Sequence, residues 1–216
     1  MTKGRQFSLA LVLVAVLIGL ATALAYLLRD NPAAKARSDN AEVRLAAIDE
    51  LARSNSRSAA AAIAPLTGDG DARVACRALT AISKFKRPED ASRVRAAAED
   101  PRPEVREAAV AASGAFKPAV DPAFLADIVR KDKSPAVRLA AIRALGALRA
   151  REGLLALLDA MEDPSPEIRS AAGVALRKCV LVDYGFRAND PEDKRRAAVA
   201  NARSDVMQLM GLSPPN

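Results

Sequence analysis

Residues 132–146 read Asp-Lys-Ser-Pro-Ala-Val-Arg-Leu-Ala-Ala-Ile-Arg-Ala-Leu-Gly, and variants of this stretch recur along the chain. Aligned on its valine, the copies lie 31, 31, 32 and 31 residues apart. We call the aligned residues the reference positions: Val43, Val74, Val105, Val137 and Ile168. Four residues later every copy has alanine, and the next residue is large and apolar in four of the five. A repeat of this length indicates a solenoid of stacked units.

The repeated stretch has the pattern of an amphipathic helix. Ser134 is a candidate N-cap, and Pro135 suits the first helical position, where its missing amide has no partner to lose. Apolar residues then recur at three- and four-residue steps from Val137 to Leu148, which is the spacing of a helix with one buried side. Gly146 lies inside this pattern, and we expect it to mark a close contact between helices.

Shorter apolar segments lie between the repeated helices, and each predicts the first helix of a two-helix unit. They cover residues 62–66, 91–98, 124–129 and 154–161, and glycine- or proline-containing breaks flank them. The sequence therefore predicts an all-α fold, an α-solenoid of about five two-helix repeats over residues 41–182.

The repeat pattern ends after Val182, and residues 183–216 have a different composition. Asp190 is a candidate N-cap, Pro191 suits the first helical position, and two acidic residues follow, all of which indicate a helix start. We expect a C-terminal helix that caps the exposed end of the solenoid and ends in a short tail.

The N-terminal region carries a hydrophobic segment, residues 7–28, without a charged side chain. As a helix it would span about 33 Å, which is enough to cross the hydrocarbon core of a bilayer. Residues 1–6 form a basic flank, and the polar residues 29–40 are predicted as a linker to the repeats. The sequence thus predicts one transmembrane helix in front of the solenoid.

Two fates are open for this segment. Uncut, it tethers the protein as a single-pass anchor; cut after Ala25, where Ala-Leu-Ala has the small-x-small form of a signal-peptidase site, it releases a secreted protein. The apolar run continues past the candidate cut to Leu28, which favours the anchor. An N-terminal segment followed by one long domain favours a repeat domain on the exported side, periplasmic or extracellular.

The composition argues against several kinds of site. The 216 residues carry a formal charge of +7 and include no histidine, the commonest general base and metal ligand. We find no phosphate loop, nucleophile motif or metal-ligand cluster, and we predict no catalytic residue, cofactor or metal. Cys76 and Cys179 fall in predicted helices, where we expect buried small side chains. The charge excess is mild and is too weak alone to indicate nucleic acid as the partner.

The pattern Asp-x-x-x-x-Val-Arg-x-x-Ala-x-x-Ala-Leu resembles HEAT repeats, in the short bacterial form found in HEAT-like scaffold proteins and bilin lyases. The resemblance covers about residues 38–182. In that family the aspartate and the arginine form a ladder between successive repeats, so the resemblance implies a structural role for both. The ladder residues predicted in this way are Asp69, Asp100, Asp132, Asp163, Arg44, Arg106, Arg138 and Arg169. The first repeat departs with Ser38 at the aspartate position, and the second with Ala75 at the arginine position.

Two groups of basic residues have a second interpretation. The ladder arginines could form a stripe for phosphates or an acidic partner, although the available aspartates favour internal pairing. Basic residues ten positions after the reference have no matching acid and are better candidates for partner binding: Arg53, Lys84 and Lys178. They also suit the negative end of a helix, so both roles stay open for them.

The sequence therefore predicts a membrane-tethered, non-enzymatic scaffold or adaptor that binds a partner protein. One alternative, implied by the resemblance to bilin lyases, is a lyase- or chaperone-like subunit that handles a tetrapyrrole or another ligand. A second alternative is nucleic-acid binding, which the positive charge favours and the membrane segment opposes. All three share one fold, so the fold alone does not choose among them.

Overall fold

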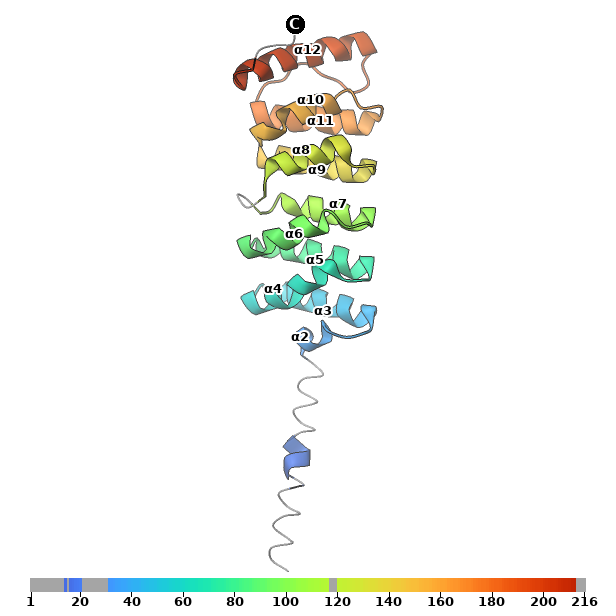
Figure 1. The fold of residues 1–216 in the computed structure, drawn as a ribbon, viewed down its shortest axis with the longest axis vertical. Coiled ribbons are helices and arrows are strands. Elements are labelled where there is room, and N and C mark those ends of the chain that lie inside the picture. The colour runs from blue at the N-terminus through green and yellow to red at the C-terminus, as the bar shows by residue number, and fades with distance from the viewer. Residues whose placement is uncertain (1–13, 15, 21–30, 117–119, 213–216) are drawn as a thin grey trace, which may run out of the picture.

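The computed structural model describes residues 14, 16–20, 31–116 and 120–212. Within these ranges the chain contains helices and no strand, and residues 31–116 and 120–212 form an elongated stack of helix pairs (Figure 1). The N-terminal pair lies at one end of the stack and the C-terminal helix covers the other (Figure 1). The predicted all-α solenoid is confirmed.

Each repeat pairs a shorter first helix with a longer second helix that carries the reference position. The first helices are α2 (Pro32–Lys35), α4 (Arg57–Ile63), α6 (Ala91–Ala97), α8 (Pro122–Lys131) and α10 (Leu154–Ala160). The second helices are α3 (Ala41–Ser54), α5 (Ala72–Phe85), α7 (Pro103–Ser113), α9 (Pro135–Leu148) and α11 (Pro166–Val180). Short 3-10 turns adjoin three of the first helices: η1 (Ala64–Gly68), η2 (Pro88–Asp90) and η3 (Arg151–Gly153).

The hydrophobic core runs along the stack between the two layers of helices. Val74, Val105 and Val137 are fully buried, and so is the alanine four residues after each of them. Small residues let the second helices approach closely: a Cβ atom added to Gly146 of α9 would lie 3.0 Å from the Cα atom of Ala175 in α11. The predicted close helix contact at Gly146 is confirmed.

The C-terminal helix α12 (Glu192–Leu209) closes the stack by packing on α10. Its buried side chains, Val199, Ala202 and Val206, recur at three- and four-residue steps. The helix begins one residue later than the sequence predicts. Pro191 has extended backbone angles and is the N-cap, so Asp190 lies outside the helix and does not cap it with its side chain.

Residues 31–40 contain the short helix α2, although the sequence predicts a linker there. Asn31 caps this helix by accepting a hydrogen bond from the Ala33 amide, and Pro32 occupies the first turn. Ala36 is buried in the same cluster as Ala47 and other residues of the first repeats. α2 therefore supplies the first helix of the first repeat.

Among the residues that the structure describes, none of the helices is both long enough and apolar enough to cross a membrane. The predicted span 7–28 falls largely outside the described residues, since only 14 and 16–20 within it are described, and those are helical. The basic flank 1–6 and the candidate cut after Ala25 also lie outside them.

Several second helices end at a residue with left-handed backbone angles. Non-glycine residues of this kind are Asn55, Lys86, Arg149 and Leu181, with φ from 45° to 61°. Asparagine tolerates this conformation, whereas lysine and arginine are strained in it and glycine is not.

We predict that Lys86→Gly and Arg149→Gly each raise the free energy of unfolding by about 0.5 kcal/mol in urea denaturation. Asn55→Gly is the control and should change it less; a loss of stability in both test variants would contradict the prediction.

Candidate interaction surface

Ion pairs join successive repeats along one edge of the stack. Each arginine follows the reference position of one repeat, and each aspartate precedes the second helix of the next. The pairs, with their shortest N···O distances, are Arg44 with Asp69 (2.7 Å), Arg106 with Asp132 (2.9 Å) and Arg138 with Asp163 (3.2 Å). Their side chains are only 8–20% exposed, so these pairs are part of the packed structure.

Each pair also fixes the loop in front of a second helix. Arg106 donates to the carbonyls of Asp100 and Pro101 at 3.0 and 3.1 Å, while Asp132 accepts a hydrogen bond from the Ser134 amide at 2.8 Å. Ser134 occupies the predicted N-cap position, but its own side chain makes no capping hydrogen bond. The hydrogen bond from Arg106 lowers the pKa of Asp132, so this carboxylate is ionised at neutral pH.

The ladder takes a different form at Asp100, because Ala75 stands where the preceding repeat would supply an arginine. Arg102 pairs with Asp100 at 2.8 Å instead. The same guanidinium donates to the carbonyls of Gly70 and Asp69 at 2.8 and 3.1 Å, and so connects the second and third repeats. Sequence reasoning missed Arg102, although one signal was present. It occupies the position at which other repeats have Asp71, Ser134 or Ser165.

Arg169, the last predicted ladder arginine, has no acidic partner within the described ranges, so the expected ion pair is replaced. It donates to the carbonyl of Ala188 at 2.8 and 3.1 Å. Ala188 belongs to residues 181–191, the non-helical segment between α11 and α12, which we call the strap. Phe186 of the strap packs over Gly173, where an added Cβ atom would lie 2.9 Å from the ring. The strap thus occupies the place of a further repeat.

The candidate partner-binding residues Arg53, Lys84 and Lys178 are exposed in the last turns of α3, α5 and α11. Arg53 also donates to the Asp49 carbonyl at 3.2 Å, as a basic residue at a helix end is expected to do. α3 and α5 are neighbours, but α7 and α9 separate α5 from α11. The structure therefore places Arg53 and Lys84 on neighbouring helices and Lys178 on a different part of the surface.

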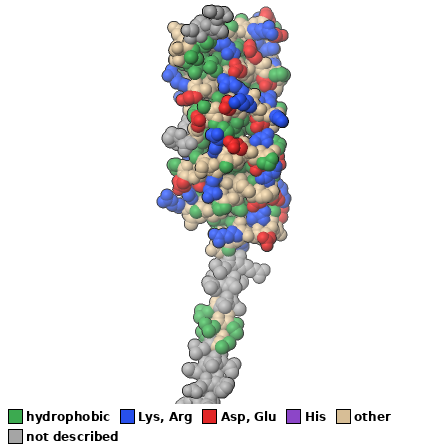
Figure 2. All heavy atoms as spheres, in the orientation of Figure 1, with side chains coloured by type: hydrophobic (Ala, Val, Ile, Leu, Met, Phe, Trp, Pro, Cys, Tyr) green, Lys and Arg blue, Asp and Glu red, His purple; other side chains and the backbone are tan. Residues whose placement is uncertain are grey.

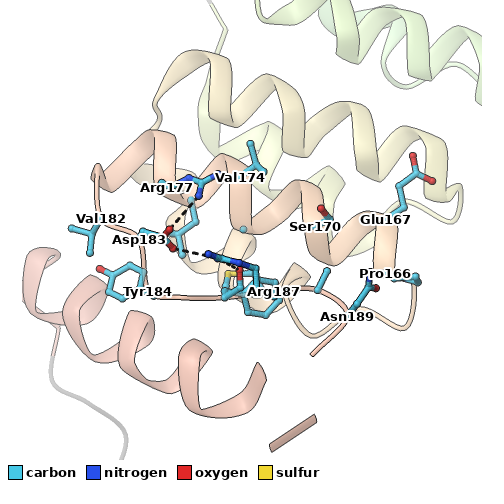
Figure 3. A pocket seen from close by; sticks show the side chains of 15 residues that line it. Pro166, Glu167, Ser170, Val174, Arg177, Val182, Asp183, Tyr184, Arg187 and Asn189 are labelled. Carbon is cyan, nitrogen blue, oxygen red and sulfur yellow. Dashed lines mark hydrogen bonds and ion pairs between the residues drawn. The ribbon is translucent and has the colours of Figure 1, made fainter. Parts of the chain in front are cut away.

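A hollow of about 590 Å³ lies between α11 and the strap (Figure 3). Val174, Arg177, Asp183 and Arg187 line it among others. Asp183 stands between the two arginines, with N···O distances of 3.4 Å to Arg177 and 3.7 Å to Arg187. The Gly185 amide and both guanidinium groups lower the pKa of Asp183, so this carboxylate is ionised at neutral pH.

A second hollow, of about 620 Å³, lies on the other side of α11, against α9. Arg143 and Lys178 line it, and it shares Glu167, Ser170 and Val174 with the first hollow. The two hollows therefore adjoin across the exposed face of α11. We call them together the α11 site.

The described residues contain no group of three or more histidine, cysteine, aspartate or glutamate side chains that could hold a metal ion. Cys76 and Cys179 are half-buried rather than buried as predicted, and burial raises the pKa of the Cys76 thiol, which makes it a weak nucleophile at neutral pH. Basic and acidic side chains alternate over the face drawn in Figure 2, unlike a continuous basic stripe for nucleic acid.

A family model of HEAT repeats matches residues 30–114 and 122–203, which is most of the chain. The chain belongs to the HEAT-repeat family. The match includes α2, which agrees with its place as the first helix of the first repeat in this HEAT-repeat protein. A search of curated proteins gives no significant match.

Solved structures with similar folds include two repeat-protein complexes. The complex of CpcE and CpcF of phycocyanin lyase from Nostoc sp. PCC7120 aligns with a TM-score of 0.58 at 20% identity, over 77% of this chain and 73% of that one. A designed armadillo repeat protein in complex with the peptide (KR)4 aligns with a TM-score of 0.54 at 16% identity, over 82% of this chain and 92% of that one. At these identities the similarity shows the fold of this HEAT-repeat protein and nothing further.

Proposed function

We propose that this HEAT-repeat protein is a membrane-tethered, non-enzymatic scaffold that binds a partner protein on the exported side of the membrane. The proposal rests on one observation: the second helices expose Arg53, Lys84 and Lys178, for which the described residues contain no ion-pair partner. Both similar structures fit such a role, since one is a complex of two proteins and the other holds a peptide. The tether is supported by the uncharged segment 7–28, and the exported side by the single long repeat domain that follows this segment.

The scaffold proposal is tested by charge reversal. Full-length protein is purified from its native membrane in mild detergent, and co-purifying proteins are quantified by mass spectrometry. We expect a stoichiometric partner whose recovery falls about tenfold or more when Arg53, Lys84 and Lys178 are all changed to glutamate. The matched control changes the exposed lysines Lys131, Lys133 and Lys194 to glutamate, with the same net charge. Equal recovery with both variants would remove these three residues from the interface.

The tether has its own test, which is independent of the partner. If the segment is an uncut anchor, the protein stays in the membrane fraction after washing with alkaline carbonate, and the mass of the purified chain includes residues 1–25. A soluble protein whose mass begins at Tyr26 would instead establish cleavage. An alkaline phosphatase fused after α12 should be active in a bacterial host if the repeats lie on the exported side.

Ligand handling is a second candidate, favoured by the size of the hollow of about 590 Å³ beside α11. Its test is an absorbance titration of the full-length protein with biliverdin, a linear tetrapyrrole. The scaffold proposal predicts the spectrum of free biliverdin at every ratio. A saturable spectral shift that Arg177→Glu removes would favour the ligand-handling subunit.

A further inference from the structure

We propose that the α11 site binds a linear peptide segment of a partner protein in which carboxylates flank an apolar side chain. This inference rests on the proposed scaffold function, and it names the site and the chemistry of the partner segment. It concerns a surface distinct from the one that Arg53 and Lys84 form on α3 and α5.

The apolar part of the site is exposed where other repeats are polar or small. Val174 is 40% exposed at the centre of the outer face of α11. The equivalent residues of the other repeats are Asp49, Thr80, Ala111 and Arg143. Val182, 44% exposed, lies on the strap side of the same hollow (Figure 3). Each valine offers exposed apolar surface for an apolar side chain of the peptide.

The charged part of the site is positive. Four basic side chains line the two hollows, Arg143, Lys178, Arg177 and Arg187, against the two acidic ones, Glu167 and Asp183. The balance of four positive and two negative groups leaves two positive charges around the valines. Acidic residues on either side of an apolar residue would complement this arrangement.

The ion pairs within the site are long. The N···O distances are 3.4 Å from Arg177 to Asp183, 3.7 Å from Arg187 to Asp183 and 3.8 Å from Arg143 to Glu167. The ladder pairs, in contrast, lie between 2.7 and 3.2 Å. Guanidinium groups with such loose internal partners keep N–H groups available for a second carboxylate.

A peptide fits these features better than a nucleic acid. Single-stranded nucleic acids are bound by aromatic side chains on which bases stack, together with a continuous basic groove. In the α11 site the Phe186 ring is turned onto Gly173, and Glu167 and Asp183 interrupt the basic residues. The exposed apolar side chains of the site, Val174 and Val182, are aliphatic, and the aromatic ring of Tyr184 is only partly exposed.

The test begins with full-length protein in lipid nanodiscs and a random peptide library displayed on phage. We expect the selected peptides to be enriched in aspartate and glutamate around one aliphatic residue. A labelled consensus peptide is then titrated against the variants by fluorescence polarisation. We expect about tenfold weaker binding for Val174→Asp and for Arg177→Glu. Binding of the peptide to the wild-type protein should also weaken at high salt, because salt screens the attraction between opposite charges.

Because Arg177 also contacts the strap, a second variant with changes only on α9 and α11, Arg143→Glu with Lys178→Glu, keeps the test independent of strap folding. Helical circular dichroism and an unchanged melting temperature show that each variant is folded. The double variant Arg53→Glu with Lys84→Glu is the control and should bind the peptide normally.

The outcomes that would overturn the inference can be distinguished from one another. If the selected peptides are not enriched in acidic residues, or if the peptide binds all α11 variants normally, the α11 site is excluded as the site of an acidic peptide. If binding is instead lost in the Arg53 and Lys84 variant, the scaffold proposal stands and its surface lies on α3 and α5. Binding of single-stranded DNA that the α11 variants lose, with no peptide selected, would assign the site to nucleic acid.

Discussion

Replacing Arg106 with alanine is expected to lower the free energy of unfolding by about 3 kcal/mol. The guanidinium donates two hydrogen bonds to Asp132, at 2.9 and 3.0 Å, and two more to backbone carbonyls of its own loop. Its removal leaves the Asp132 carboxylate, whose side chain is 11% exposed, without its ion-pair partner. Urea denaturation at neutral pH, followed by circular dichroism, measures the loss.

The control for this prediction is Arg143→Ala on α9. Arg143 is 69% exposed and lies 3.8 Å from Glu167, so its pair is weak and screened by water. We expect a change within about 0.5 kcal/mol. Similar losses from the two variants would show that the ladder contributes no more than a surface pair.

The pair of Arg106 and Asp132 also predicts how the stability of the protein changes at acidic pH. Arg106 lowers the pKa of Asp132 in the folded state, so the pair stabilises the protein fully above the ordinary carboxyl pKa of about 4 and less as the pH falls through the lowered value. The stability difference between wild type and Arg106→Ala should therefore shrink below about pH 4. A difference that stays constant down to pH 2 would contradict this assignment.

Replacing Gly146 with leucine is expected to cost about 3 kcal/mol, because the space between α9 and α11 is already full. Even a Cβ atom at this position would come within 3.0 Å of both the Cα and the Cβ atoms of Ala175, and backbone cannot move aside as a long side chain can. Thermal and urea unfolding measure the effect.

The matched control for Gly146 is Ala136→Leu, an exposed position in the first turn of the same helix. We expect that variant to stay within about 0.5 kcal/mol of wild type. If Gly146→Leu were equally mild, the close packing of α9 on α11 would be refuted.

The repeat spacing was enough to predict the stack, because the buried valine and alanine positions recur with the same period as the helix pairs. The arginine pattern on the helices did not predict the contact of Arg102, whose guanidinium reaches back across a loop to the carbonyls of Asp69 and Gly70. That contact depends on the three-dimensional path of two loops. An arginine pattern on the helices alone carries no information about it.

The contacts at the C-terminal end of the solenoid could not be predicted from the sequence either. The sequence shows that Gly173 replaces a large apolar residue, but only the fold shows that Phe186 covers this glycine and that Ala188 accepts the Arg169 hydrogen bonds. The sequence also grouped Arg53, Lys84 and Lys178 as candidates for partner binding, because each lies ten positions after its reference position. In the fold, two helices between α5 and α11 separate Lys178 from the other two.

The central claim is that this HEAT-repeat protein docks a partner protein through its second helices, and cross-linking mass spectrometry tests it most directly. The full-length chain is treated in its native membrane with an amine-reactive cross-linker before extraction in mild detergent. The scaffold proposal predicts a stoichiometric partner, cross-linked at Lys84 and Lys178. A chain recovered without a partner, or cross-links confined to Lys131, Lys133 and Lys194, would contradict it.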